Sequence, residues 1–264
     1  MIAKLRDFGS FWAAIFERMD KTHMTLIAAG VAFYAMFAAF PGIAAIISLW
    51  SLWFDPDVVL TYMEVANEFL PEGAAAIIDD YLMGLTEGEQ TTFGWTFFVS
   101  FMIATVAARA GVDALIRGLN AAYGVRAHST IFGFFLAYGL TLVIVGISLA
   151  GLATIVIVPL VLNFFVFAPV RGILVTALPW AGMYVLVILT IGVLYRYGPN
   201  VSTPRTPIIT VGALFAAFLW SAGSIAFSAY ISSFNSYNRI YGSIGTVVAL
   251  LMWFYLAGFS VLLG

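Results

Sequence analysis

Residues 26–54 read LIAAGVAFYAMFAAFPGIAAIISLWSLWF and contain no charged side chain. A helix rises about 1.5 Å per residue, so roughly 20 apolar residues cross the hydrocarbon core of a bilayer. This run is longer than that requirement. We therefore interpret it as a membrane-spanning helix, with Pro41 as an interruption near its middle.

Five more uncharged runs follow the first one, at residues 90–108, 129–170, 172–195, 206–238 and 240–264. The run 129–170 is long enough for two spans, but Pro159, Asn163 and Pro169 interrupt its second part. We predict one long span over residues 131–159, followed by a re-entrant or surface loop. The sequence thus predicts an all-α, polytopic membrane protein in which residues 1–264 form one domain with six transmembrane helices.

The composition excludes several classes of protein. Hydrophobic residues make up 63% of the chain and charged residues 9%, whereas soluble domains carry roughly 25% charged residues. With no cysteine and only two histidines, far apart at His23 and His128, we expect neither a metal site nor a cofactor. A net charge of −2 disfavours nucleic-acid binding. We find no HExxH, GxSxG or post-strand GxGxxG motif, and expect no enzyme.

The basic residues predict the orientation of the chain. If the N-terminus is inside, the inner segments hold most of the Lys and Arg residues, and only Arg171 and Arg239 lie outside. Because positive charge collects on the cytoplasmic side, both termini are predicted to be cytoplasmic. The inner basic residues are Lys4, Arg6, Arg18, Lys21, Arg109, Arg117, Arg126, Arg196 and Arg205.

Two segments outside the predicted spans have amphipathic patterns. Residues 1–22 carry charges that exclude a signal peptide and apolar residues at helical spacing, which predicts a helix lying on the membrane surface. Residues 55–92 carry many acids and no Lys or Arg, and we predict two short outer helices there. These acids are either simply tolerated outside or form a vestibule that attracts cations.

Several motifs resemble those of the YihY/BrkB family of bacterial inner-membrane proteins, a family once mislabelled as ribonuclease BN. The resemblance implies six transmembrane helices in the cytoplasmic membrane and a polar tail beyond Gly264, without one agreed activity. The motifs are Ala32–Tyr34, Phe40-Pro41, Arg109–Leu115, Leu119–Tyr123, Leu194–Asn200, Gly212-Ala213, Trp220, Tyr230, Tyr241–Gly245 and Trp253.

One helical face of the second span gathers four polar residues, namely Arg109, Asp113, Arg117 and Asn120. Counted from Phe93, Arg109 lies within hydrocarbon depth and Asp113 near the inner boundary. Asp113, at i+4, is the expected partner of Arg109. Two readings stay open: Arg109 extends to the inner interface and fixes topology, or it binds a phosphate head group or a solute carboxylate.

Weaker candidates lie elsewhere in the chain. Tyr34 and the segment Tyr241–Gly245, which includes Ser243, are candidate ligand-binding residues. The small residues of that segment suit either an anion site before a helix or close helix packing. The polar run 232–238 is favoured as a loop over an opening. Pro41 and Pro179 suggest two broken spans in an inverted repeat.

These observations favour an inner-membrane transporter or lipid-handling permease of unknown substrate. Its expected partners are the lipid bilayer and an anionic lipid or small anionic solute, with association into a homo-oligomer left open. The alternative is a non-transporting envelope scaffold or maintenance protein that acts through partners. An intramembrane enzyme is the third class, and we find no catalytic constellation for it.

Overall fold

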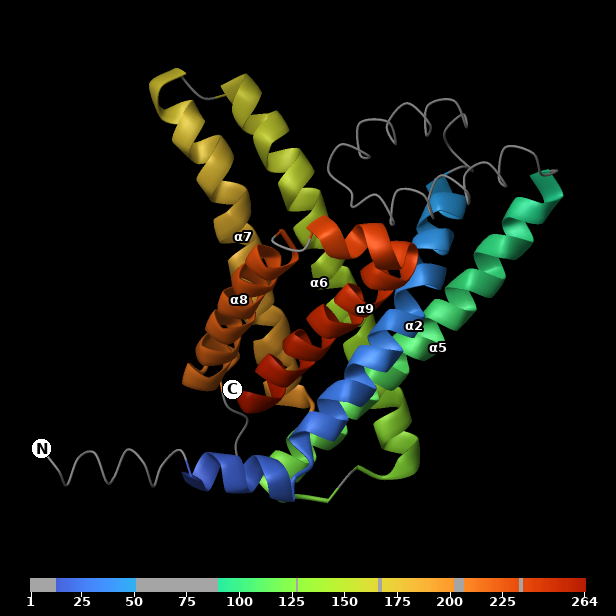
Figure 1. The fold of residues 1–264 in the computed structure, drawn as a ribbon, viewed down its shortest axis with the longest axis vertical. Coiled ribbons are helices and arrows are strands. Elements are labelled where there is room, and N and C mark those ends of the chain that lie inside the picture. Colours follow the sequence, from blue (N-terminus) through green and yellow to red (C-terminus); the bar gives the residue numbers. More distant parts are fainter. Residues whose placement is uncertain (1–12, 51–89, 127, 166–167, 202–206, 233–234) are drawn as a thin grey trace, which may run out of the picture. The chain divides into compact units, whose positions relative to one another are not determined.

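The computed structural model describes residues 13–50, 90–126, 128–165, 168–201, 207–232 and 235–264. Every regular element within these ranges is a helix, which confirms the predicted all-α class (Figure 1). A short helix covers residues 13–21. The longer helices are α2 (Met24–Trp50), α5 (Gln90–Tyr123), α6 (Thr130–Phe165), α7 (Ala168–Tyr197), α8 (Val211–Ser232) and α9 (Asn235–Leu263).

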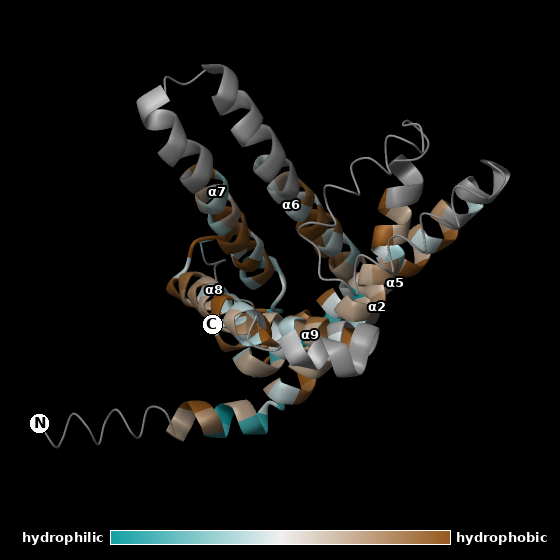
Figure 2. Cartoon of the chain, turned by 45° about the horizontal axis from the view of Figure 1, so that its top comes forward, coloured by the Kyte–Doolittle hydropathy of each residue, from teal (hydrophilic) through white to brown (hydrophobic). Residues whose placement is uncertain are grey.

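Five of these helices contain a segment that is long and apolar enough to cross a membrane, so the chain is a multi-pass membrane protein. Apolar residues cover much of these helices in Figure 2. The sixth predicted span corresponds to α9, whose described apolar part, Val247–Leu263, is shorter. A sixth crossing therefore stays a prediction. The five segments are Met24–Ile46, Phe97–Tyr123, Ile131–Gly151, Leu178–Tyr197 and Val211–Ile231.

Helix α6 corrects the predicted loop after residue 159. It continues to Phe165, and α7 begins at Ala168. Likewise, Pro41 lies inside α2 and Pro179 inside α7, and neither proline breaks its helix. A proline removes one backbone donor and strains one turn. In lipid, however, an unwound segment would expose several backbone groups that water cannot satisfy. The apolar sequence on both sides therefore keeps these helices continuous.

The chain divides into two compact units. Unit 1 comprises residues 1–29, 112–223 and 257–264, and unit 2 comprises residues 30–111 and 224–256. The single domain predicted from the sequence stays a prediction. Of the two predicted amphipathic segments, the structure describes residues 13–21 as helix, whereas residues 1–12 and 51–89 lie outside the described residues.

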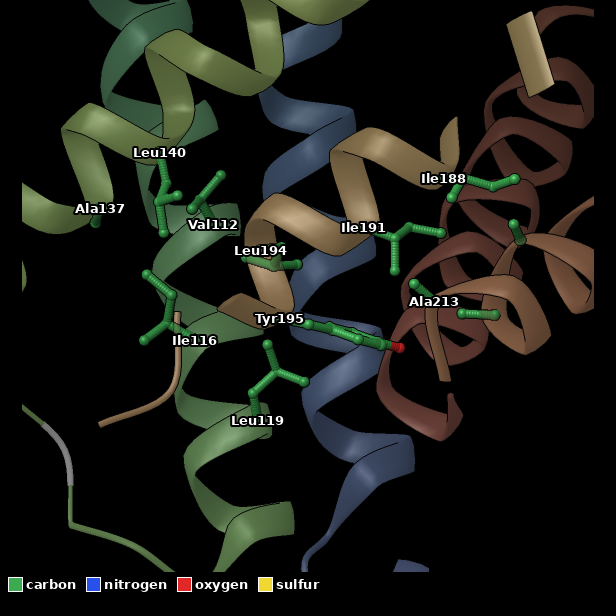
Figure 3. Close-up of a cluster of buried hydrophobic side chains, with 12 residues drawn as sticks. Val112, Ile116, Leu119, Ala137, Leu140, Ile188, Ile191, Leu194, Tyr195 and Ala213 are labelled. Atoms are coloured by element: carbon green, nitrogen blue, oxygen red, sulfur yellow. The ribbon is translucent and has the colours of Figure 1, made fainter. Parts of the chain in front are cut away.

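The core of unit 1 is built from α5, α6, α7 and α8 (Figure 3). Alanines at positions 137, 213, 216 and 217 are fully buried, so these helices approach each other closely. Helices α6 and α7 lie side by side, because an added Cβ at Gly151 would lie 3.3 Å from Met183 Sδ. The larger members of this core are Val112, Ile116, Leu119, Leu140, Ile188, Ile191, Leu194 and Tyr195.

Unit 2 contains residues 30–50 of α2, 90–111 of α5, 224–232 of α8 and 235–256 of α9. An added Cβ at Gly111 of α5 would lie 3.5 Å from the Cβ of Tyr34 in α2, which indicates close contact between these two helices. Helices α8 and α9 are joined by a hydrogen bond that Trp253 Nε1 donates to Ser224 Oγ at 3.2 Å. Tyr34 and Arg109 thus lie on two neighbouring helices.

Candidate functional site

Arg109 lies inside the apolar segment Phe97–Tyr123 of α5 and is half-buried. It is twelve residues beyond Phe97 (109 − 97), or about 18 Å along the helix axis. The segment continues to Tyr123, so Asp113 and Arg117 also fall within it. The sequence alone had placed Asp113 at the boundary. Arg109 therefore lies inside a candidate membrane span, well away from the first residue of that span.

Asp113 forms its ion pair with Arg117. Arg117 Nε donates to Asp113 Oδ2 at 2.9 Å, and the two side chains are 71% and 23% exposed, respectively. The sequence had suggested Arg109 as the partner of Asp113. An i,i+4 pair of this exposure contributes only a few tenths of a kcal/mol. Its main effect is local, because it holds the Asp113 carboxylate against the following turn of α5.

Asn120 is buried and makes a structural contact at the end of α5. Its Oδ1 accepts a hydrogen bond from the backbone N–H of Asn200 at 2.8 Å. Asn200 Nδ2 in turn donates to the carbonyl of Arg126 at 3.1 Å. Asn120 therefore joins the segment after α7 to the end of α5. The sequence had grouped Asn120 with the ligand-binding face, and its Gly198-Pro199-Asn200 motif predicts a turn without indicating which distant residue the turn contacts.

The short helix 13–21 contacts the C-terminal end of α5, where Asn120 also lies. Arg18 Nη2 donates to the carbonyl of Ala122 at 2.7 Å. The last carbonyls of a helix lack intrahelical partners and carry partial negative charge, so a guanidinium stabilises them. Gly124 then turns the chain with a φ of 68°, the left-handed conformation typical of helix ends. Sequence reasoning did not find this contact of Arg18.

A cavity of about 220 Å³ lies where helices of unit 1 end. Tyr195 forms part of its wall, and the Tyr195 hydroxyl donates to the carbonyl of Val261 in α9 at 2.5 Å. Figure 3 shows Leu119 and Tyr195 beside each other at this end of the core. The full lining is Met24, Leu119, Ala122, Tyr123, Tyr195, Leu262, Leu263 and Gly264. The walls are thus mostly apolar, with two tyrosines.

The remaining candidates, Tyr34, Tyr241 and Ser243, belong to α2 and α9. Tyr34 belongs to unit 2, where its ring meets Phe33 edge-on at 5.5 Å. Tyr241 and Ser243 lie within α9, and their side chains are outside the described residues. The segment Tyr241–Gly245 thus lies inside α9 and not before it, and its role in ligand binding stays a prediction. The predicted loop over residues 232–238 is also wrong from Asn235 onward, because α9 begins there.

Comparison with known proteins gives the family. The family described as virulence factor BrkB matches residues 15–264. The chain belongs to this family. The resemblance seen in the sequence motifs is thereby confirmed, because the match extends over nearly the whole chain. No solved structure matches.

Individual relatives cover different shares of their own length. A ribonuclease-like protein of Bacillus subtilis, YfkH, is 27% identical over 216 residues, which is 76% of this chain and 73% of the relative. A UPF0761 membrane protein of Xanthomonas axonopodis is 28% identical over 207 residues, or 46% of its length. One from Pseudoalteromonas translucida is 44% identical over 71 residues, or 23% of its length. The chain thus spans less than half of these two UPF0761 proteins.

Chemically, the described residues offer cations and hydrogen-bond donors. Among them, no group of three or more His, Asp and Glu side chains could hold a metal ion. The guanidinium groups of Arg18 and Arg109 suit carboxylate or phosphate oxygens, because their N–H groups form a planar fork. Each of these two guanidinium groups is therefore a candidate contact for an anion.

Proposed function

We propose that this BrkB-family protein is a transporter or lipid-handling permease of the bacterial inner membrane, and that Arg109 recognises an anionic group of its substrate. The observation that carries the proposal is the position of Arg109 within the apolar segment Phe97–Tyr123. An arginine at the centre of a membrane helix costs about 2.5–3.5 kcal/mol on insertion scales. Such residues usually face a bundle interior or a wet cavity along a transport pathway.

Reconstitution into liposomes tests this function. Efflux of small anions and movement of fluorescent anionic lipids between leaflets are measured for the wild-type chain, Arg109→Gln and Arg117→Gln. Arg117 is the matched control, because it lies on the same helix, has the same charge and is 71% exposed. We expect Arg109→Gln to lower the flux at least tenfold and Arg117→Gln to change it less than twofold.

The outcome also separates the proposal from a scaffold role. Flux that is equal in wild type and Arg109→Gln would remove Arg109 from the pathway. Absence of flux for every substrate, together with a stable complex with another envelope protein, would favour the scaffold.

We propose no nuclease activity, since the net charge of −2 disfavours an RNA-binding surface. Both termini are proposed to be cytoplasmic, from the distribution of Lys and Arg.

A further inference from the structure

We propose that the cavity at the end of α5 binds one anionic phospholipid, with its phosphate on Arg18 and part of an acyl chain inside the cavity. The cavity and Arg18 belong to the same unit, and Arg18 contacts the carbonyl of Ala122, which itself lines the cavity. A guanidinium and an apolar cavity are thus adjacent. That juxtaposition matches an amphiphile whose charge and apolar chain are joined.

The volume suits a segment of acyl chain and not a whole lipid. About 220 Å³ equals roughly seven water volumes of about 30 Å³ each. Apolar side chains form most of the wall, so burying methylene groups there is favourable at about 25 cal/mol per Å². Tyr123 also lines the cavity and is 53% exposed, which leaves a route from the surface to the interior.

Arg18 has donors left for a phosphate. Its guanidinium carries five N–H groups, of which one donates to Ala122. The side chain is exposed, so a head group can approach it from outside the protein. Phe16, on the same helix, is 63% exposed, so this helix presents apolar as well as charged side chains at its surface. A helix of this kind lies where head groups and acyl chains meet, which is where a phospholipid presents both features.

Neighbouring charges support Arg18 as the head-group contact. Lys21 forms an ion pair with Glu17, which lies one turn earlier on the same helix. Glu17 Oε1 is 2.5 Å from Lys21 Nζ. Lys21 therefore has a carboxylate partner on its own helix. Arg18 instead pairs with a backbone carbonyl, which leaves its full positive charge. The preference for an anionic head group is accordingly assigned to Arg18.

The proposal that this cavity binds a lipid does not depend on the proposed function. Only the further step, that the bound lipid is the transported substrate, rests on it. Delipidated full-length protein is titrated with phosphatidylglycerol or phosphatidylcholine, and bound lipid is counted by native mass spectrometry. We expect the wild type to bind phosphatidylglycerol about tenfold more tightly, as for a charge-assisted bidentate contact. Arg18→Gln should bring the two affinities within twofold, and Lys21→Gln should retain the wild-type preference.

A second variant tests the cavity. Ala122→Leu fills it without removing the backbone carbonyl that Arg18 contacts. We expect it to weaken both lipids about equally while the preference for phosphatidylglycerol remains. Inorganic phosphate is the competitor that distinguishes a lipid from a free anion. Displacement by millimolar phosphate, combined with no effect of Ala122→Leu, would show a simple anion site and overturn the proposal.

The remaining outcomes are also decisive. An unchanged lipid preference in Arg18→Gln overturns the head-group assignment. If that variant fails to fold, Arg18→Lys replaces it, and a preference reduced several-fold is expected because lysine lacks the planar fork. Lipid binding without flux in liposomes would refute the proposed transport and keep the site. Arg109-dependent flux without Arg18-dependent binding would refute the site alone.

Discussion

Asn200 donates its backbone N–H to Oδ1 of Asn120 at 2.8 Å, although the two residues are eighty positions apart in the chain. Asn120 is 3% exposed, so this contact lies inside the protein. The contact ties the turn after α7 to the last turns of α5. It also explains why an amide stands on a helix whose neighbouring buried positions are apolar.

Replacing Asn120 with alanine should destabilise the protein by about 1 kcal/mol. The substitution leaves the Asn200 N–H without its acceptor, and a typical hydrogen bond contributes about 0.5–1.5 kcal/mol net. Asn200→Ala is the matched control, because it keeps this backbone bond and loses only the exposed contact with Arg126. Unfolding in mixed detergent micelles measures both. An equal or larger loss in Asn200→Ala would contradict the structural importance given to Asn120.

Gly192→Ala should cost more, at least about 2 kcal/mol. An added Cβ at Gly192 would overlap the backbone carbonyl of Ile208, which cannot rotate away as a side chain would. Gly146→Ala is the control on α6, since nothing lies within 4 Å of an added Cβ there. That change should stabilise by up to about 1 kcal/mol through helix propensity. Thermal melting in detergent compares the two, and similar melting temperatures would refute the close contact at Gly192.

The sequence predicted the helices well because their signal is physical and local. An uncharged run of 20 or more residues has few alternatives to a helix in a membrane. This rule was not followed at Pro41, Pro159 and Pro179, where the prolines were expected to interrupt the helices. A proline removes only one donor, whereas breaking a helix in lipid exposes several backbone groups. The apolar environment therefore overrides a signal that ends helices in water.

The candidate site was predicted less completely, because its contacts join distant segments. Helical periodicity placed Arg109, Asp113 and Arg117 on one face and suggested Arg109 as the partner of Asp113, whereas Asp113 pairs with Arg117 in the structure. It could not show that Asn120 faces Asn200, nor that Arg18 reaches Ala122, since both contacts cross more than seventy residues. Periodicity describes one helix at a time. The packing of helix ends around a cavity depends on tertiary structure.

Acidic pH should weaken the fold through His128. This residue lies between the apolar segments of α5 and α6, and burial lowers its pKa below the ordinary value of 6.5 because the charged form loses hydration. The folded chain thus favours neutral imidazole. Its contribution to stability is complete above pH 6.5 and is lost as the pH falls through the lowered pKa.

Melting temperatures at pH 8 and pH 5 test this effect. The wild type and His23→Gln, which keeps His128, should lose more stability on acidification than His128→Gln does. An equal loss in all three proteins would show that other groups carry the pH dependence.

The orientation of the chain can be tested with single cysteines, because the natural sequence has none. Glu72→Cys lies in the acidic segment, for which the sequence predicts an outer location, and Val201→Cys lies in the turn after α7, predicted to be inner. Intact spheroplasts are treated with a membrane-impermeant maleimide. We expect labelling at position 72 without permeabilisation and at position 201 only after it. The reverse pattern would invert the topology and place Arg18 and the lipid cavity at the outer leaflet. Labelling of both positions in intact spheroplasts would place them on the same side of the membrane, so that an even number of crossings, and not the predicted three, would separate residues 72 and 201.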